Sequence, residues 1–217
     1  MILQSESALD LNTLESSVLL VGGLWSGGLN SLRDAALSVA REGQRIQVFD
    51  GHGDWTARQP AIGSHIQVID KPYRRSPVLP AGQIQVWRAP CREPQDMDAL
   101  WLALDPNSGA PGPDVFIFSR TLPMLRHGWA TLDSWIGAWE DRTRIIFYVD
   151  GLDLYTFLLP LVREVILYPH EVGPEIEFAL NAGGLSTSEW NNLPPGQFVR
   201  LPDPLNSVPT ALPERFL

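Results

Sequence analysis

The segment from residue 18 to residue 50 constrains the fold more than any other part of the chain. It begins with four apolar residues, enters the glycine-rich turn "GGLWSGG", and continues at about residues 29–41 with apolar residues at helical spacing. Gly43 ends this helical pattern, and a second apolar run follows at residues 45–50. A strand that enters glycines directly, then a helix and another strand, indicates a βαβ unit in a buried, parallel sheet.

The rest of the chain repeats this alternation of strands and helices. Buried-type apolar runs occur at residues 114–119, 144–150 and 164–168, and a last extended stretch follows the turn "LPPG". The residues between these runs have the composition of crossover helices, which we predict at about 94–104, 121–140 and 152–162. Such alternation predicts an α/β fold with a mostly parallel, helix-covered sheet.

The middle of the chain differs, because its apolar residues alternate with polar ones. The runs "HIQVID" and "IQVWRA" have this period of two, which is typical of half-exposed strands. We therefore expect a small antiparallel addition beside the parallel sheet. The predicted organisation is an N-terminal arm (1–16), a single α/β domain (17–202) and a C-terminal tail (203–217).

Charge and composition disfavour several classes of protein. The formal net charge of the 217 residues is -9, the wrong sign for a chain that grips nucleic acid by itself. The single cysteine, Cys91, cannot form an intramolecular disulfide. The sequence has neither a signal peptide nor an apolar run long enough to span a bilayer. We expect a soluble, intracellular and cytoplasmic protein without membrane insertion.

In chain order, the motifs resemble the FtsK/HerA branch of P-loop NTPases, which includes DNA translocases, conjugation coupling proteins and viral packaging ATPases. The resemblance covers about residues 17–202. It rests on "GGLWSGGLN", "VFDGHGDW", "DVFIFSR" and "DRTRIIFYVD", and on the ending "LNAGGLSTSEWNNLPPGQFVRL". It implies a P-loop NTPase fold of RecA/HerA-like type, ATP and Mg as ligands, and a tendency to form rings.

The phosphate loop has the shape of the motif but lacks its reactive side chains. Such loops surround phosphates with backbone N–H groups, supply a Lys to the β- and γ-phosphates, and ligate magnesium through Ser or Thr. Gly28 and Leu29 stand where the Lys and the Ser or Thr belong. Asn30 is the nearest substitute, or a helix cap. The predicted degenerate nucleotide-binding loop consists of Gly22, Gly23, Ser26, Gly27, Gly28, Leu29 and Asn30.

Two further strands have lost the residues that hydrolysis needs. A hydrolytic site usually ends the acidic strand with Asp and Glu, whereas "VFIF" is followed by Ser119 and Arg120. Asp150 stands near the place of the polar sensor residue. We therefore predict a P-loop-type fold without hydrolysis. An active motor with unorthodox residues is the alternative; its catalytic candidates are Asp50, Arg120 and Asp150, and its cation would come from Arg33, Arg120 or a neighbouring subunit.

The motif after the second strand, "DGHGDW", contains Asp50, His52, Gly53 and Asp54. The two carboxylates and the imidazole have the composition of a metal site. Asp50 is better explained as a cap on the backbone amides of an ordered turn, so we predict no metal site. Asp150 and Asp153 form a second acidic pair, for which a helix cap at Asp153 is the preferred interpretation.

A dinucleotide-binding Rossmann unit is a further alternative, since Asp50 ends the second strand where a ribose-binding acid belongs. The glycines do not match Gly-x-Gly-x-x-Gly, and Asp50 follows Gly22 by 28 residues, where about 20 is usual. A serine hydrolase built on Ser26 is disfavoured, because that nucleophile turn normally comes later in the sheet.

Basic residues gather near the middle strands and could face DNA or an acidic partner; a solvated hairpin explains them equally well. Trp135 and Trp139, four residues apart on one predicted helix, are expected in the core. We predict a structural or regulatory subunit that binds itself or other proteins within a DNA-handling, virion or secretion assembly, with DNA contacted through that assembly. The basic set is Arg58, Lys71, Arg74, Arg75 and Arg88, interleaved with Tyr73 and Trp87.

Overall fold

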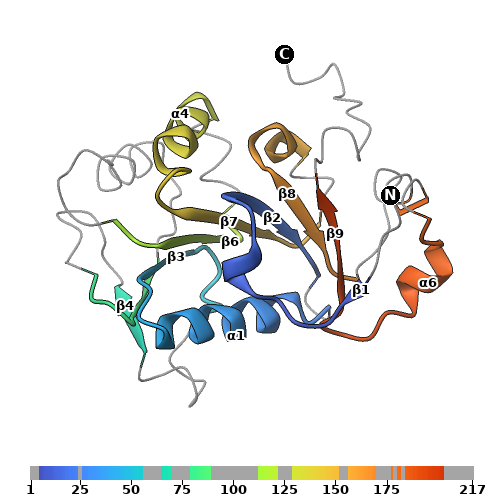
Figure 1. The fold of residues 1–217 in the computed structure, drawn as a ribbon, viewed down its shortest axis with the longest axis horizontal. Coiled ribbons are helices and arrows are strands. Elements are labelled where there is room, and N and C mark those ends of the chain that lie inside the picture. Colours follow the sequence, from blue (N-terminus) through green and yellow to red (C-terminus); the bar gives the residue numbers. More distant parts are fainter. Residues whose placement is uncertain are drawn as a thin grey trace.

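The structure, a computed structural model, is a single sheet with helices on both of its faces (Figure 1). It describes residues 5–23, 26–55, 65–69, 79–88, 112–121, 129–151, 156–169, 177, 180–181 and 184–202. The described sheet has nine strands in the order β1-β9-β8-β2-β7-β6-β3-β5-β4. The strands are β1 (Ser5–Glu6), β2 (Ser17–Val21), β3 (Ile46–Asp50), β4 (Ile66–Ile69), β5 (Ile84–Arg88), β6 (Val115–Ser119), β7 (Arg144–Val149), β8 (Glu164–Leu167) and β9 (Phe198–Pro202).

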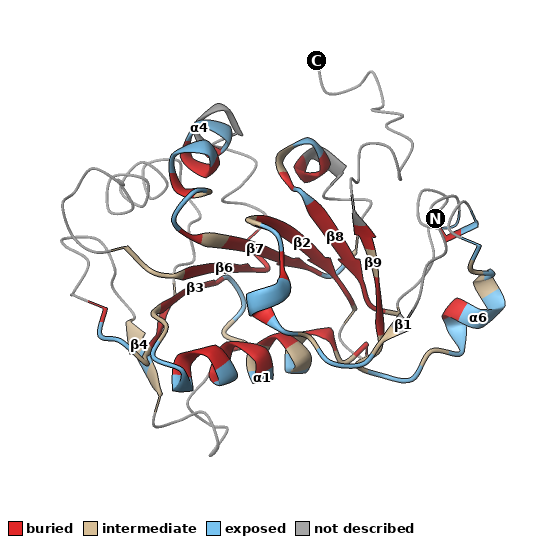
Figure 2. Ribbon diagram, in the orientation of Figure 1, coloured by how far each residue is buried: buried red, intermediate tan, exposed pale blue. Residues whose placement is uncertain are grey.

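From β8 to β4 in the strand order, the seven described strands run parallel to one another. At the other end of the sheet, β9 pairs antiparallel with β8, and β1 pairs antiparallel with β9. The sequence-predicted fold class, a mostly parallel, helix-covered α/β sheet with a small antiparallel part, is therefore confirmed. The central strands are buried along their whole length, as their continuous apolar runs predict (Figure 2).

Two apolar clusters separate the sheet from its covering layers. On one face α1 (Gly28–Arg41) packs through Leu32, Ala36 and Val39. On the other face lie α4 (Trp129–Trp139) and the 3-10 helix η2 (Thr156–Leu161). Figure 1 shows α1 below the sheet and α4 above it. Trp135 and Trp139 belong to the core, as predicted from their spacing.

The short α6 (Thr187–Asn191) lies beyond the β9 end of the sheet in Figure 1. It begins with a capping box, in which the Ser186 hydroxyl accepts a hydrogen bond from the Glu189 backbone N–H and the Glu189 carboxylate accepts one from the Ser186 backbone. Trp190 anchors this helix in the core. Among the described helices, none combines the length and apolar character needed to cross a membrane.

The sequence predicts an antiparallel addition formed by "HIQVID" and "IQVWRA", and this predicted location is wrong. These runs form β4 and β5, which are parallel to each other and to β3, and the antiparallel pairs lie at the opposite edge of the sheet. The alternation misled because Gln85 is completely buried: its side chain accepts a hydrogen bond from the indole of Trp87 (2.8 Å). A buried polar residue with a partner produces the same pattern as a half-exposed strand.

Other expected elements agree with the structure to different extents. Of the expected helix at residues 152–162, the described part is the 3-10 helix η2. The expected N-terminal arm includes β1 and a second 3-10 helix, η1 (Leu11–Thr13), whose Leu11 is buried. The expected helix at residues 94–104 and the C-terminal tail at 203–217 lie outside the described residues.

Candidate functional site

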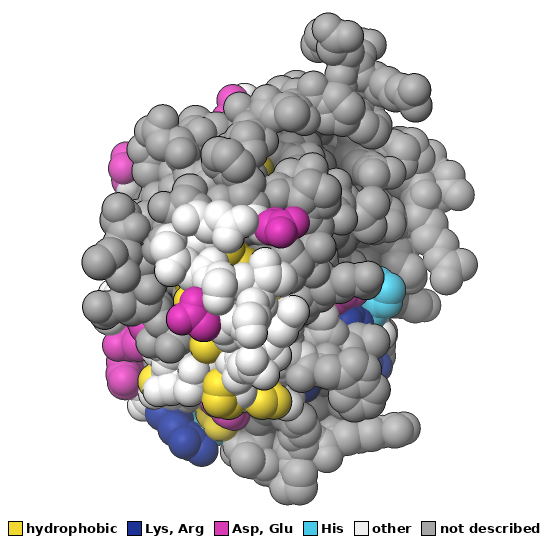
Figure 3. Space-filling view, turned by 90° about the vertical axis from the view of Figure 1, so that its right-hand side faces the viewer, with side chains coloured by type: hydrophobic (Ala, Val, Ile, Leu, Met, Phe, Trp, Pro, Cys, Tyr) yellow, Lys and Arg dark blue, Asp and Glu magenta, His cyan; other side chains and the backbone are white. Residues whose placement is uncertain are grey.

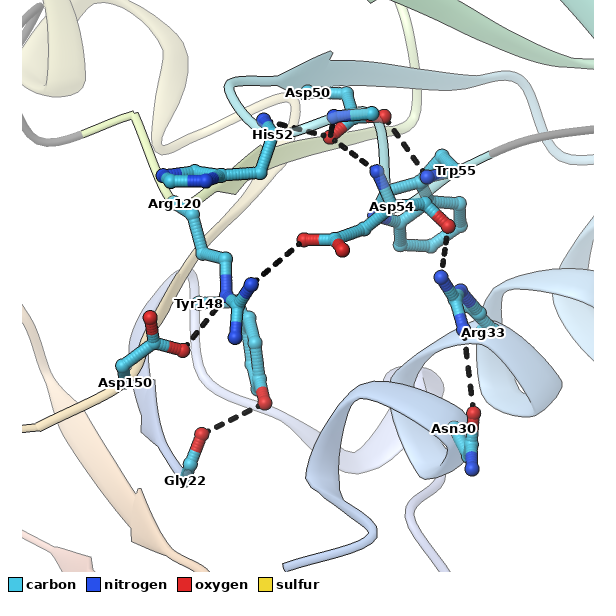
Figure 4. A network of polar contacts seen from close by, with 11 residues as sticks. Gly22, Asn30, Arg33, Asp50, His52, Asp54, Trp55, Arg120, Tyr148 and Asp150 are labelled. Carbon is cyan, nitrogen blue, oxygen red and sulfur yellow. Dashed lines mark hydrogen bonds and ion pairs between the residues drawn. The ribbon is translucent and has the colours of Figure 1, made fainter. Parts of the chain in front are cut away.

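The candidate site is built at the carboxyl ends of four neighbouring parallel strands, where ligands of open α/β sheets usually bind. Strand register places Asp50 of β3 beside Ser119 of β6, and Ser119 beside Tyr148 of β7. The glycine loop follows β2, the next strand along. Figure 4 shows Asp50, Tyr148 and Gly22 of the glycine loop with the polar contacts around them.

Asp50 organises the loop that follows β3. One carboxylate oxygen, Oδ1, accepts hydrogen bonds from the backbone N–H groups of His52 (3.3 Å), Gly53 (2.9 Å) and Asp54 (3.0 Å). The other, Oδ2, accepts from the N–H of Trp55 (2.8 Å). Asp50 is 3% exposed, so these amides take the place of water around its charge. The interpretation of Asp50 as a cap on this turn is confirmed.

Arg120 occupies the centre of the network. Its Nε donates a hydrogen bond to Oδ1 of Asp150 (2.7 Å), and its Nη1 lies 3.3 Å from Oδ2 of Asp54. The guanidinium is buried, whereas the Asp150 side chain is 49% exposed. Arg120 is also the one non-glycine residue with positive φ (53°) in the described part of the chain. Its backbone therefore adopts a conformation that a tightly packed surrounding must maintain.

A second arginine lies nearby on α1. Arg33 donates to the Oδ1 of Asn30 (3.2 Å) and to the backbone carbonyl of Asp54, and its guanidinium lies 5.9 Å from the centroid of the Trp55 ring. Partial burial lowers the pKa of Arg33, and the charges of Asp54 and Asp50 oppose that shift. Arg33 thus fastens the loop after β3 to the helix that follows the glycine loop.

The glycine loop is closed by hydrogen bonds between its backbone and the side chain of Ser26. The Ser26 hydroxyl donates to the carbonyl of Gly23 (2.8 Å) and accepts from the backbone N–H of Gly28 (3.2 Å). The backbone N–H of Ser26 also donates to the Gly23 carbonyl (3.1 Å). Ser26 is buried, so its hydroxyl lies inside the turn and provides the acceptor that a phosphate oxygen would otherwise provide.

Two tyrosines fill the space beside this loop. The Tyr148 hydroxyl donates to the carbonyl of Gly22 (2.8 Å). Burial raises the pKa of Tyr148 to about 12 and raises that of Tyr168 as well. The Tyr168 ring lies so close that a Cβ at Gly28 would come within 2.9 Å of its Cδ2, and one at Gly22 within 2.9 Å of its Cβ.

The turn before β9 closes the loop from another side. The backbone N–H of Gly196 donates to the carbonyl of Ser26 (2.9 Å), and a Cβ at Gly27 would come within 2.6 Å of the Gly196 nitrogen. Gly27 has φ of 81°, which favours glycine independently of this contact. The glycine at position 27 is thus explained both by its backbone conformation and by the approach of "LPPG".

The structure brings most of the predicted site residues together. The loop glycines, Asp50, Asp54, Arg120 and Asp150 all lie at one edge of the sheet, within the network of Figure 4 or directly beside it. His52 is exposed, and Gly53 provides a positive φ (78°) in the turn. Asn30 is not the helix cap: it lies inside α1, its side chain contacts Arg33, and Gly27 is the N-cap residue.

Sequence reasoning missed the two tyrosines, which make the largest difference to the loop. A signal was present, because Tyr148 lies near the carboxyl end of β7, two residues before Asp150. Tyr168 ends the apolar run "EVILY" on a strand adjacent to β2. An aromatic residue with a polar tip at the carboxyl end of a buried strand is a candidate to fill a ligand site from within.

The residues present do not fit a magnesium triphosphate of the usual kind. The Gly28 N–H already donates to Ser26, Leu29 offers no side-chain oxygen, and the buried Ser119 stands where an acidic ligand belongs. The described residues contain no cluster of three or more His, Cys, Asp or Glu side chains that could hold a metal ion. Asp153 lies outside the described residues.

Strand order excludes the Rossmann alternative. In a dinucleotide-binding unit the first two strands of the βαβ unit are neighbours, and the ligand crosses the point where strand order reverses. Here β2 lies between β8 and β7, and both β7 and β6 separate it from β3. The carboxylate of Asp50, which a ribose would need, is already occupied by four backbone amides.

The basic set predicted near the middle strands is only partly described. Trp87 is completely buried in the core, so it is not an aromatic platform for nucleic acid. Acidic side chains are scattered over the described part of the face around α6 (Figure 3). Arg88 ends β5, whereas the other members of the set and the interleaved Tyr73 lie outside the described residues; these members are Arg58, Lys71, Arg74 and Arg75.

Comparison with known proteins finds no matching family model and no match among curated protein sequences. Solved structures do match. The genome packaging NTPase of Sulfolobus turreted icosahedral virus 2, in complex with ATP-gammaS, has a TM-score of 0.60 and 12% identity over 89% of this chain and 95% of that chain. The cytoplasmic domain of the Thermomonospora curvata Type VII secretion ATPase EccC has a TM-score of 0.53 and 14% identity.

The EccC match covers 86% of this chain and 25% of that one. A third structure, the DNA-packaging ATPase from Sulfolobus turreted icosahedral virus, has a TM-score of 0.52 and 12% identity over 86% of this chain and 92% of that chain. These comparisons show that the chain shares the fold of these packaging and secretion ATPases, in agreement with the P-loop NTPase fold that its motifs predict. At such identities the similarity extends to the fold alone, so function must be argued from the site.

Proposed function

We propose that this chain is a catalytically degenerate P-loop NTPase-like protein, which acts as a structural or regulatory subunit of a DNA-handling, virion or secretion assembly. The observation that carries the proposal is the position of Arg120. It stands where a hydrolytic site has an acid, and it holds Asp54 and Asp150 in ion pairs (3.3 and 2.7 Å). A guanidinium can neither ligate magnesium nor accept a proton from water at neutral pH.

The charges around the loop support the same proposal. Arg33 and Arg120 bring two positive charges to the network, while Asp50, Asp54 and Asp150 bring three negative ones. The described site therefore offers a triphosphate no net attraction of the kind that a loop Lys would provide. In the alternative, an active motor, Arg120 would have to contact a phosphate while its charge is already paired with the carboxylates of Asp54 and Asp150.

The loop itself supports loss of tight nucleotide binding. The Ser26 hydroxyl already accepts the hydrogen bond of the Gly28 N–H, which belongs to the helix N-terminus where phosphate would bind. Releasing this N–H requires the buried Ser26 hydroxyl to lose a hydrogen bond, at a cost of about 1 kcal/mol. The contacts of a bound nucleotide would have to outweigh this free-energy cost without a Lys in the loop.

The assembly is proposed by analogy with the matched structures. Two of those proteins are viral packaging NTPases and one is a secretion ATPase. The fold is shared, and a chain that keeps the fold without the reactive residues can keep the surfaces through which such proteins assemble. Protein partners or further copies of the chain are therefore the proposed ligands, with DNA contacted through the assembly.

Equilibrium binding of ATP, ADP and a non-hydrolysable analogue, with and without magnesium, tests the proposal together with a phosphate-release assay. Quenching of the eight tryptophans provides the binding signal. The expected result is no magnesium-dependent phosphate release, and no saturable binding below about 1 mM nucleotide, where binding free energy is only about 4 kcal/mol.

Asp150→Asn is the matched control, because Asp150 is half-exposed and the change alters charge with little loss of packing. Release that is identical in the native chain and in this variant would come from a contaminating enzyme. Magnesium-dependent release that the native chain shows, and that changes severalfold in Asp150→Asn, would instead establish the active motor.

A further inference from the structure

Three neighbouring strands carry the same tripeptide. Ile-Gln-Val begins β3, β5 and β4, at Ile46, Ile84 and Ile66. The parallel pairing aligns these copies without offset, so that each residue lies beside its equivalent in the adjacent strand. The sheet therefore contains a ladder of three Ile, one of three Gln and one of three Val, which ends at β4.

The glutamine ladder is joined by hydrogen bonds. Nε2 of Gln47 donates to the backbone carbonyl of Gln85 (3.2 Å), and Nε2 of Gln85 donates to Oε1 of Gln67 (3.4 Å). Gln47 and Gln85 are buried, whereas Gln67 is exposed. Within the described residues, the amide nitrogen of Gln67 has no acceptor, so the ladder ends with a donor that another strand could use.

The backbone of β4 is oriented for further pairing. The N–H of Ile84 donates to the carbonyl of His65, which fixes the alternation of β4 relative to β5. In a parallel pair every second residue turns its N–H and C=O toward the neighbour. His65, Gln67 and Ile69 therefore face β5, and Ile66 and Val68 turn their backbone groups to the outer edge of the sheet.

We propose that β4 pairs with β4 of a second copy of this chain, antiparallel and around a two-fold axis at Gln67. In that register Ile66 lies opposite Val68 of the partner subunit, and both present outward backbone groups, so each pair exchanges two hydrogen bonds. Gln67 meets its own equivalent as the non-hydrogen-bonded pair between them. The sheet then continues through the axis and joins two nine-stranded sheets.

The sequence of the strand favours a second copy over an unrelated partner. Ile-Gln-Val is nearly symmetrical about its glutamine, so reversing the strand again places a β-branched residue opposite a β-branched one. The amides of two Gln67 side chains can extend the ladder already present on β3, β5 and β4. The strand carries no charge, so the net charge of -9 is not concentrated at the contact.

The inference rests on the proposed function and gives it a particular form of self-association. A two-fold contact uses the same surface on both copies and closes after two, unlike the head-to-tail contacts of a ring. Four residues form a small contact, so we expect a reversible dimer that populates with increasing concentration. Its test measures self-association and is independent of nucleotide binding.

Disulfide trapping at Gln67 provides the sharpest test. With Cys91 replaced by Ser, Gln67→Cys places two thiols on the axis at a Cα separation of about 4.5 Å, within the disulfide range. Ile66→Cys is the matched control, because its two copies lie about 8 Å apart, beyond the range. We expect a covalent dimer under mild oxidation from Gln67→Cys and at least tenfold less from Ile66→Cys.

Sedimentation velocity over a concentration series gives a second, reversible readout. Gln67→Glu puts two like charges on the axis and should weaken the dimer at least tenfold, whereas Asn191→Asp, the same change on exposed α6, should leave it unchanged. Val68→Pro removes only an outward N–H and should also weaken it. A chain that stays monomeric at every concentration overturns the inference, as does an oligomer that is insensitive to Gln67→Glu and fails to cross-link.

Discussion

Two loops at the carboxyl ends of the parallel strands direct backbone N–H groups inward, but the acceptors of these N–H groups differ between the two loops. After β3, four amides converge on the carboxylate of Asp50, which is an internal anion. After β2, the N–H of Gly28 donates to the neutral hydroxyl of Ser26, and the neutral hydroxyl of Tyr148 donates to the carbonyl of Gly22. The first loop is an anion site that carries its own anion, and the second is an anion-type loop filled by neutral groups.

The difference indicates which loop can still change. A buried carboxylate with four donors cannot leave without exposing all of them, so the loop after β3 is a fixed support for Arg120 and Arg33. A hydroxyl group both donates and accepts hydrogen bonds, and because it is neutral, separating it from its partners costs less free energy than separating a buried carboxylate from its donors. The glycine loop is therefore held by several weaker contacts, and its packing against Tyr168 and the turn at Gly196 matters as much as its hydrogen bonds.

Removing the internal anion should have the largest effect. Asp50→Ala leaves four backbone amides without their acceptor, three of them in a part-buried turn, and should lower the free energy of unfolding by about 3–5 kcal/mol. Urea denaturation followed by circular dichroism measures this change. Asp34→Ala, on the exposed face of α1, is the control and should change stability by less than about 0.5 kcal/mol. Equal effects of the two substitutions would contradict the assigned role of Asp50.

Crowding the glycine loop should come second. Gly27→Ala adds a Cβ within 2.6 Å of the Gly196 nitrogen and also strains a backbone with φ of 81°, for an expected loss of about 2–4 kcal/mol. Gly43→Ala is the matched variant, since its φ is 95° but no atom lies within 4 Å of the added Cβ. It should lose only about 1–2 kcal/mol, the cost of the left-handed conformation. Thermal melts of both variants separate crowding from strain.

Removing one neutral group should have a smaller effect that depends on pH. Tyr148→Phe deletes the hydroxyl that donates to the Gly22 carbonyl and should cost about 1–2 kcal/mol near neutral pH. Because folding raises the pKa of Tyr148 from 10.0 to about 12, its stabilisation is complete below about pH 10 and is lost as the pH rises through about 12.

The phenylalanine variant should therefore lose less stability than the native chain between these two pH values. Denaturant titrations across that range provide the measurement, with Tyr168→Phe as a second buried tyrosine for comparison. An unchanged alkaline slope in Tyr148→Phe would contradict the assignment of this linkage to Tyr148.

The smallest effect is expected at the exposed end of the network. Asp150→Asn removes one of the two carboxylates around Arg120 but leaves Asp54 at 3.3 Å and keeps an oxygen that can accept from Nε. Since the Asp150 side chain is half-exposed, the loss should be about 0.5–1 kcal/mol and should decrease at high salt. A loss as large as that of Asp50→Ala would mean that the arginine depends mainly on Asp150.

Much of the fold could be predicted because buried parallel strands have a distinctive pattern. The runs that became β2, β6, β7 and β8 are continuous apolar segments, and α1 has apolar residues at helical spacing. Strand direction at β4 and β5 was mispredicted, because the buried Gln85 has the same sequence signature as an exposed polar residue. The Gln85 amide accepts from Trp87 in its own strand and donates to Gln67 in the adjacent β4, and no local pattern contains the second contact.

The site was predicted in part for the same reason. Absence of Lys at Gly28 and of acids at Ser119 and Arg120 is visible in the sequence, as is the turn-forming chemistry of Asp50. The pairing of Arg120 with Asp54 and Asp150 is not, since these residues follow three different strands and meet only through sheet order. The same holds for Tyr148 and Tyr168, whose rings reach the glycine loop from strands on either side of β2.

The sequence by itself determined the class of fold, the glycine-rich composition of the loop after β2, and the absence of a Lys at Gly28 and of acids at Ser119 and Arg120. These follow from hydrophobic periodicity and from which side-chain atoms each position has, both of which are local properties. Only the tertiary structure decided what replaced the missing groups. Strand order brings an arginine between two carboxylates, places tyrosines against glycines and aligns three glutamines in one ladder, because contacts between distant residues are set by packing.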